Sequence, residues 1–223
     1  MGRMIAERLA EVHRRIAEAA ERSARDPAGV ELVAVSKRQP PEHLEAAYAA
    51  GHRVFGESRA QELVAHADVL PDDVSWHMVG HLQRNKAGVV AGIASALHSL
   101  DSERLARAWA RTGSDVPVYV QVNLAEEPQK GGVLPDDLDG LLTVCADLPI
   151  PVIGLMALPP FDPDPEAARP WFRQLRGLRD TLGERHPTLR GLSMGMSGDF
   201  EVAIEEGSTS IRVGTTIFGP RLG

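Results

Sequence analysis

Cysteine, long apolar runs and excess basic charge are all scarce in this 223-residue chain, and each scarcity excludes a class of protein. A single cysteine, Cys145, rules out an internal disulfide and a cysteine-rich metal site. Its place in the apolar helical run 141–148 predicts a buried, inert thiol. No apolar run approaches the length of a membrane span, and the N-terminus lacks the apolar stretch of a signal peptide. We therefore expect a cytoplasmic protein that makes no membrane contact.

Basic residues are outnumbered, since 24 Lys and Arg face 31 Asp and Glu and leave a net charge of -7. A protein that binds nucleic acid through its charge would instead show a basic stripe. The hydrophobic fraction of 43% suits one sizeable core, and α/β barrels of this length fold as one domain. No linker, repeat or low-complexity segment interrupts the chain, so we predict a single domain over residues 1–223.

Strand-like and helix-like segments alternate from end to end. The opening segment is helical because apolar residues such as Ile5, Leu9 and Val12 recur at three- and four-residue steps. Several of the strand-like runs are short and continuously apolar, as expected when both faces of a sheet are covered. The predicted strands are 31–36, 52–55, 74–79, 96–99, 118–122, 152–156, 189–193 and 210–213. The predicted helices are 4–23, 42–50, 60–69, 82–93, 102–111, 135–145, 165–182 and 200–206.

Eight strands separated by helices predict an α/β fold, a single (β/α)₈ barrel of the TIM type. Seven helices follow strands, and the extra N-terminal helix is expected to complete the outer ring. An open, doubly wound sheet is the alternative. It is weaker because no Gly-x-Gly-x-x-Gly turn follows the first strand.

One lysine stands at the end of the first strand-like run. Val33, Val35 and Lys37 share one face of an extended segment, because side chains alternate across a strand. The amine therefore lies where the strand ends, before the Pro40-Pro41 pair. Apolar neighbours disfavour the charged form of a lysine, and a neutral lysine forms a Schiff base with an aldehyde.

Two loops near the C-terminus are suited to a phosphate group. In barrels, phosphate sites often form after the seventh and eighth strands. Ser197 and Gly198 follow the seventh strand and precede a helix, where unpaired backbone N–H groups favour an anion. Gly214 and Thr215 follow the eighth strand. Ordinary turns, with Ser197 or Asp199 as a helix N-cap, are the alternative.

Arg212 lies within the last predicted strand, between two apolar residues. Its side chain therefore points to the face opposite theirs. A buried guanidinium is costly unless acceptors surround it, so this arginine is a candidate ligand-binding residue. A structural ion pair with Glu57 or Asp101 is the alternative.

At this point the residues resemble a known family, the pyridoxal phosphate homeostasis proteins, which have the alanine-racemase N-terminal barrel fold. The similarity covers nearly the whole chain, with similar spacing. The matching motifs are Ala-Val-Ser-Lys at 34–37, Phe-Gly-Glu at 55–57 with Gln61 and Glu62, Trp-His-Met-Val-Gly-His-Leu-Gln-Arg-Asn-Lys at 76–86, His-Ser-Leu-Asp at 98–101, Gln-Val-Asn at 121–123, Lys-Gly-Gly at 130–132, Gly-Leu-Met at 154–156 and the stretch from Leu192 to Arg221.

The resemblance implies a pyridoxal 5'-phosphate site that uses the residues singled out above. Lys37 would hold the cofactor as an internal aldimine, and Arg212 would face the pyridine nitrogen. The phosphate would be held by Ser197, the backbone around Gly198, and Gly214 with Thr215. One position departs from the family, which usually has asparagine after Phe-Gly-Glu. Here Ser58 is shorter and lacks the amide donors, so its contact with the ring is lost or bridged by water.

The same resemblance favours a cofactor carrier over an enzyme. A guanidinium beside the pyridine nitrogen disfavours its protonation and weakens the ring as an electron sink. Racemases with this barrel take a second base from a tyrosine on an additional domain, whereas this chain has only Tyr48 and Tyr119, neither expected at the catalytic end. We therefore predict no catalytic residue. A weak racemase-like enzyme and a class I aldolase that uses Lys37 directly remain the alternatives.

The predicted partners are the cofactor and, by resemblance, apo-enzymes that need it, with the chain acting as a monomer. No metal is expected, because His77 and His81 around Gly80 lack a nearby carboxylate pattern and are better explained as structural. The glycine loop 129–132 either closes over the cofactor or simply turns the chain. The residues alone do not separate these two roles.

Overall fold

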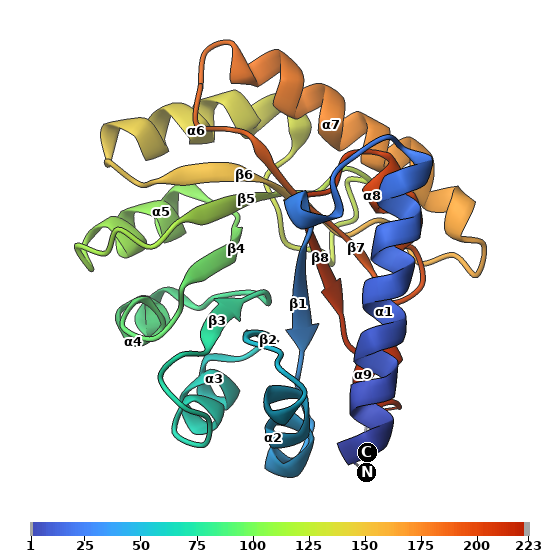
Figure 1. The fold of residues 1–223 in the computed structure, drawn as a ribbon. Coiled ribbons are helices and arrows are strands. Elements are labelled where there is room, and N and C mark those ends of the chain that lie inside the picture. The colour runs from blue at the N-terminus through green and yellow to red at the C-terminus, as the bar shows by residue number, and fades with distance from the viewer. Residues whose placement is uncertain (1, 221–223) are drawn as a thin grey trace.

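The computed structural model of the protein describes residues 2–220 and shows eight parallel strands closed into a barrel (Figure 1). Each strand pairs with the next in sequence, so the connections between them cross outside the sheet. The strands are β1 (Glu31–Val35), β2 (Val54–Glu57), β3 (Ser75–Met78), β4 (Ala96–Leu100), β5 (Val118–Val122), β6 (Val152–Ala157), β7 (Gly191–Met196) and β8 (Ser210–Val213). The predicted (β/α)₈ barrel is confirmed, and the open, doubly wound sheet is wrong.

Closure of the barrel depends on pairing between the first and last strands. In this parallel pair, Val33 lies opposite Arg212 and Ala34 lies opposite Val213. The end of β1, where Lys37 follows, therefore lies beside the end of β8. Lys37 and Arg212, which are 175 positions apart in sequence, are thus brought to the same end of the barrel.

Helices surround the barrel and cover the outer faces of the strands. The N-terminal helix α1 (Gly2–Arg22) buries its apolar stripe, which includes Ile5, Leu9, Val12 and Ile16. It packs against the helices on either side of the β1–β8 pair and completes the ring there, as expected. These are α2 (Pro41–Ala49), α8 (Phe200–Glu205) and α9 (Thr215–Phe218). The other α-helices are α3 (Ala60–Ala67), α4 (Ala87–Ala91), α5 (Glu103–Ala110), α6 (Leu138–Asp147) and α7 (Arg169–Gly183).

Some helices differ from their predicted extent. The segment predicted as one helix over 82–93 is a short 3-10 turn, η2 (Arg84–Lys86), followed by α4, so Lys86 lies in the turn. Glycines at 88 and 92 weaken helix propagation there. The segment 165–182 is likewise divided into η4 (Pro165–Ala168) and α7, because Pro170 fits only the first turn of a helix. Another 3-10 turn, η3 (Pro135–Asp137), precedes α6, and η1 (Pro27–Gly29) precedes β1.

The main apolar core lies between the strands and the helices rather than inside the barrel. Trp109, Phe55, Phe172 and Phe200 are its largest fully buried side chains. Cys145 is buried in this core, and burial raises its pKa to about 12, so the predicted inert thiol is confirmed. Within residues 2–220, no helix is both long and apolar enough to cross a membrane.

Candidate functional site

A pocket of about 810 Å³ opens at the C-terminal ends of the strands, where barrels of this type place their functional residues. It brings together residues from the ends of β1, β2, β7 and β8. All seven residues predicted for the site line it: Lys37, Ser58, Ser197, Gly198, Arg212, Gly214 and Thr215.

Lys37 lies two residues beyond β1, in a turn closed by a hydrogen bond from the Gln39 N–H to the Ser36 carbonyl (3.0 Å). Arg38 adopts a left-handed conformation (φ 57°) in this turn. A non-glycine residue in that region costs about 1–2 kcal/mol, and such strain is often found beside functional side chains. The turn leaves Lys37 half-buried with Val35, its neighbour on the same face, also lining the pocket.

The two loops predicted for phosphate are joined to each other by hydrogen bonds. The Gly214 N–H donates to Ser197 Oγ at 3.2 Å, so the ends of β7 and β8 form one concave edge of the pocket. The Asp199 carboxylate accepts from the Met196 N–H at 2.6 Å inside its own loop. Asp199 occupies the N-cap position of α8, as the alternative expected, but its side chain makes no capping hydrogen bond to the helix. Because α8 has only six residues, the loop amides and hydroxyls, rather than a helix dipole, are the anion-binding groups on offer.

The Arg212 guanidinium is buried inside the barrel and reaches the floor of the pocket, with a side chain only 4% exposed. One nitrogen donates to Ser193 Oγ and another donates to the Ala157 carbonyl at 3.0 Å. Within residues 2–220, no carboxylate lies within ion-pair distance of this guanidinium, so the predicted alternative of an ion pair with Glu57 or Asp101 is wrong. Burial lowers its pKa to about 10, only partly offset by the charge of Asp199.

Glu57, at the end of β2, has partners other than the Arg212 of the alternative interpretation. Its side chain is fully buried and accepts hydrogen bonds from Ser36 Oγ (2.5 Å) and His66 Nδ1 (2.8 Å). Burial raises the pKa of this carboxyl, and the bonds from His66 and Ser36 oppose the rise. The bond to Glu57 fixes Ser36, the residue before Lys37, and neither Ser36 nor Glu57 lines the pocket.

Ser58 lies on the wall of the pocket, and the chain passes close behind it. A Cβ atom at Gly80 would lie 2.3 Å from the Ser58 carbonyl oxygen and 2.7 Å from its Cα. Only glycine therefore fits at position 80. The close approach fixes the backbone of Ser58 at the pocket wall even though its side chain is short.

The segment that follows β6 forms the outer wall of the pocket. It includes Pro159, Phe161 and Asp164, and the Phe161 side chain is 92% exposed although it lines the pocket mouth. Lys130 holds this wall from the neighbouring loop, because its Nζ donates to the Pro159 carbonyl at 3.1 Å and forms an ion pair with Glu127 at 2.8 Å. The glycine loop 129–132 thus braces the wall rather than lining the pocket.

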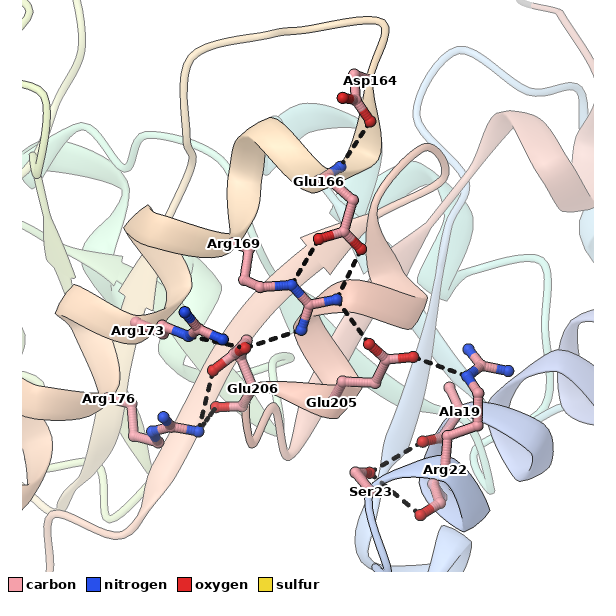
Figure 2. A network of polar contacts seen from close by, with 11 residues as sticks. Ala19, Arg22, Ser23, Asp164, Glu166, Arg169, Arg173, Arg176, Glu205 and Glu206 are labelled. Carbon is pink, nitrogen blue, oxygen red and sulfur yellow. Dashed lines mark hydrogen bonds and ion pairs between the residues drawn. The ribbon is translucent and has the colours of Figure 1, made fainter.

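A network of ion pairs anchors the other end of this wall (Figure 2). Arg169, the first residue of α7, contacts Glu166 at 2.6 Å, Glu205 at 2.7 Å and Glu206 at 2.8 Å. Glu206 is only 5% exposed and also pairs with Arg173 and Arg176. We call these six residues the outer network. It ties the pocket wall to α8, the helix that follows the Ser197 loop.

The two histidines around Gly80 are separated by the fold. His77 points into the barrel, where its Nδ1 lies 3.0 Å from Nε2 of His98. His81 lies at the pocket rim, where its Nδ1 contacts the Asp101 carboxylate at 3.1 Å. His77 therefore has an imidazole partner and His81 a carboxylate partner, and the sequence pattern indicated neither. In the described part of the chain, no cluster of three or more His, Cys, Asp or Glu side chains is arranged to hold a metal ion.

The sequence did not indicate three further features of the site. Ser193 and His98, which contact each other at 2.7 Å, lie beneath Arg212 and come from strands 95 residues apart. The wall beginning at Leu158 lies in a proline-rich loop with no periodic pattern. The His-Ser-Leu-Asp motif at 98–101 and the stretch from Leu192, which contains Ser193, gave a signal, but neither indicated a role for His98 or Ser193.

A lysine, a buried arginine and an anion-suited edge in one barrel mouth describe a lysine-based cofactor barrel. In agreement with this, the family described as alanine racemase, N-terminal domain, matches residues 8–221. The chain is 17% identical to the alanine racemase of Bartonella henselae, whose structure superposes with a TM-score of 0.70 over 99% of this chain and 59% of that one. At that identity the likeness shows the fold alone.

Closer relatives define the group within this class. A pyridoxal phosphate homeostasis protein of Aquifex aeolicus is 44% identical, with 96% of this chain and 97% of that protein covered. The structure of PipY of Synechococcus elongatus with pyridoxal phosphate bound is 38% identical, with a TM-score of 0.83 over 96% of this chain and 100% of that one. The chain therefore belongs to the alanine racemase N-terminal domain family and, within it, to the pyridoxal phosphate homeostasis proteins.

Proposed function

We propose that this protein binds pyridoxal 5'-phosphate in the pocket at the barrel mouth and serves in pyridoxal phosphate homeostasis. The observation on which this rests most directly is the Arg212 guanidinium, which is buried at the pocket floor with no carboxylate partner among residues 2–220. A buried cation of this kind is costly unless a bound group supplies further acceptors. Lys37 and the Ser197–Gly214 edge line the same pocket and are suited to an aldehyde and a phosphate.

Each predicted residue has a distinct task in this proposal. The cofactor would supply an aldehyde, and Lys37 would hold it through the amine that condenses with an aldehyde with loss of water. Ser197, Gly198, Gly214 and Thr215 would hold its phosphate through hydroxyl and backbone N–H groups. Arg212 would donate a hydrogen bond to the ring nitrogen, and Ser58 would lie beside the ring.

We further propose that the protein holds the cofactor without catalytic turnover. Neither Tyr48 nor Tyr119 is among the described residues that line the pocket. The Tyr48 hydroxyl donates to Asp73 at 2.9 Å on the outside of the barrel. The Tyr119 ring packs inside the barrel, 4.5 Å from the His98 ring, and burial raises the pKa of its hydroxyl to about 12. Both are therefore unsuited to exchange a proton with a bound substrate.

A weak enzyme of the racemase type is the second candidate, and His81 is the observation in its favour. Among the described residues that line the pocket, it is the only imidazole, and Asp101 orients its ring at the rim. Such a group can act as a general base. Turnover of an amino acid that is abolished both by Lys37→Ala and by His81→Ala would favour this candidate over a carrier.

The absorbance spectrum of the purified protein tests the first proposal. With added pyridoxal phosphate, the wild type should show a visible band that disappears in Lys37→Ala, because the Schiff base cannot form without the amine. Lys86→Ala is the matched control, since it removes a half-buried lysine from the η2 turn and should leave the band unchanged. A wild type that remains colourless in excess cofactor would contradict the proposal.

Borohydride reduction then separates the carrier from the class I aldolase. Reduction fixes a Schiff base as a stable amine, so peptide mapping reports what Lys37 holds. A pyridoxyl group on Lys37 supports the cofactor site, whereas trapping of a sugar phosphate without bound pyridoxal identifies the aldolase.

The cellular part of the proposal concerns the partners. We propose that the protein is a cytoplasmic monomer that passes the cofactor to apo-enzymes. Mixing the loaded protein with an apo-enzyme should restore that enzyme's activity faster than the same amount of free cofactor at low concentration. Equal rates would contradict delivery by this protein.

A further inference from the structure

The interior of this barrel contains a line of polar side chains. Barrels of this type are usually filled with branched apolar residues. Here Arg212, Ser193, His98 and His77 are all buried and come from β8, β7, β4 and β3. We call these four residues the interior relay.

Successive members of the interior relay lie within hydrogen-bond distance. An Arg212 nitrogen donates to Ser193 Oγ. Ser193 Oγ lies 2.7 Å from His98 Nδ1, and His98 Nε2 lies 3.0 Å from His77 Nδ1. On its far side, His77 Nε2 lies 3.4 Å from Ser75 Oγ.

The relay spans the barrel from one end to the other. Arg212 lines the pocket at the C-terminal ends of the strands. Ser75 and Glu31 are the first residues of β3 and β1, so they mark the opposite end. A Glu31 carboxylate oxygen lies 3.8 Å from His77 Nδ1, and its side chain is 42% exposed. The relay therefore connects the pocket with the solvent-facing bottom of the barrel.

Both imidazoles in the relay are neutral at pH 7. Burial lowers the pKa of His77 to about 4. Burial, together with the charges of His77 and Arg212, lowers the pKa of His98 as well. Each ring therefore has one N–H donor and one nitrogen acceptor.

The arginine sets the direction of hydrogen bonding at one end of the relay. A guanidinium only donates, so Ser193 Oγ accepts from it. Among the described hydrogen bonds, His98 Nδ1 is the group left to accept the buried Ser193 O–H. This favours a His98 that holds its proton on Nε2 and donates it to Nδ1 of His77. His77 in turn holds its proton on Nε2, which faces Ser75.

We propose that Ser193 and His98 are positioning residues for the cofactor: through this one-directional relay they hold the Arg212 guanidinium toward the ring that the pocket binds. The inference rests on the proposed function for the identity of that ring. Neither residue lines the pocket, so replacing either one leaves Lys37 and the phosphate edge in place. The replacement removes a hydrogen bond of the relay, whereas the bond from Arg212 to the Ala157 carbonyl remains.

The tautomers of the two histidines test the relay without any cofactor. In ¹⁵N NMR spectra of the cofactor-free protein at pH 7, both His98 and His77 should be protonated on Nε2. Spectra of His98→Asn and His77→Asn assign the signals. Ser193→Ala should release His98 from this single tautomer. A wild-type His98 protonated on Nδ1, or on both nitrogens, would overturn the relay.

Cofactor titration tests the positioning role. Ser193→Ala and His98→Leu should raise the dissociation constant for pyridoxal phosphate roughly tenfold, the effect of one hydrogen bond to a charged group. His98→Asn should stay close to the wild type, because its amide oxygen accepts from Ser193. Ser208→Ala is the matched control, since Ser208 is a fully buried serine whose hydroxyl donates to backbone carbonyls outside the relay.

An analogue of the cofactor with carbon in place of the ring nitrogen shows where the relay acts. Ser193→Ala should leave its dissociation constant unchanged, since Arg212 has no acceptor on that ring. Equal weakening for both ligands would indicate a general packing defect and would overturn the positioning role. If the wild type binds neither ligand, the proposed function fails together with this role, whereas the tautomers still decide the relay itself.

Discussion

Arg212 and Arg169 are surrounded in opposite ways. Arg169 lies on the outside of the barrel, 20% exposed, and pairs with three carboxylates. Arg212 lies inside the barrel, 4% exposed, and its hydrogen bonds go to a serine hydroxyl and a backbone carbonyl. Carboxylates thus surround Arg169, whose charge is partly solvated. Arg212, whose charge costs more to bury, has only neutral acceptors among the described residues.

This difference separates a structural cation from a binding cation. The guanidinium of Arg169 has its acceptors within the chain, so it links η4, α7 and the end of α8 without a ligand (Figure 2). Arg212 retains donors for a group that enters the pocket. An uncompensated buried charge therefore indicates a ligand more directly than a large set of ion pairs does.

Protonation of the interior relay at acid pH should cause the largest loss of unfolding free energy among these tests. The pKa of His77 is about 4 in the fold and 6.5 in the unfolded chain, so the unfolded chain binds more protons between these values. Stability from this group is complete above pH 6.5 and is lost as the pH falls toward 4, by at most about 3 kcal/mol. Urea unfolding of the wild type and His77→Asn at several pH values measures the difference.

The variant is needed because other groups titrate in the same range, including His52, whose pKa burial lowers to about 4. The gap in unfolding free energy between wild type and His77→Asn should narrow on acidification. A constant gap from pH 7 to pH 4.5 would show that His77 is not held neutral by the fold.

Replacing the two kinds of arginine sharpens the comparison. Arg212→Met should raise the dissociation constant for pyridoxal phosphate roughly thirtyfold, about 2 kcal/mol, because a charged donor to the ligand is lost. The unfolding free energy should change by less than about 1 kcal/mol, since an apolar side chain replaces a charge that has no carboxylate partner in the described part of the chain. Arg173→Met, in the outer network, is the control.

The Arg173→Met control should lower the unfolding free energy and leave the dissociation constant for pyridoxal phosphate unchanged. Cofactor titration and urea unfolding on the same samples give both quantities. If Arg212→Met lost stability without losing affinity, Arg212 would be a structural cation like Arg169.

Glu206→Gln should break the outer network with a smaller effect. It removes the charge that Arg169, Arg173 and Arg176 share, and we expect a loss of about 1.5 kcal/mol in the unfolding free energy. High salt should reduce this loss, because the three arginines are 20–60% exposed and their charges are screened. Denaturation at low salt and in 1 M salt measures both effects. A loss that does not depend on salt would show that burial of Glu206 shields these ion pairs from screening.

The sequence predicted the barrel because its information was local. Short apolar runs such as 118–122 could be assigned as strands from residues next to one another, and this strand has the predicted bounds. Helix interruptions were missed where one residue changed the geometry, as Pro170 does at the start of α7. Positions of Lys37, Ser197 and Gly214 in one pocket followed from the rule that barrel sites lie at strand ends.

The interior relay could not be predicted in this way. His98 and Ser193 are separated by 95 residues, and each looks like an unremarkable polar residue in its own strand. Strand alternation places them inside the barrel, but only the stagger of β4 against β7 determines that they touch. The same applies to Arg212, for which an ion pair with Glu57 or Asp101 was the alternative and whose hydrogen bonds go instead to Ser193 and the Ala157 carbonyl.

The pocket also lies across the seam where the barrel closes, because β1 and β8 pair there. Glu31 and Ser210 in this pair are 179 residues apart, so their contact closes a loop that contains most of the chain. A ligand that touches both Lys37 and Gly214 binds only when β1 and β8 are paired. Binding therefore stabilises the closed barrel, and recovery of bound ligand during refolding reports the pairing of β1 with β8 rather than the formation of any single helix or strand.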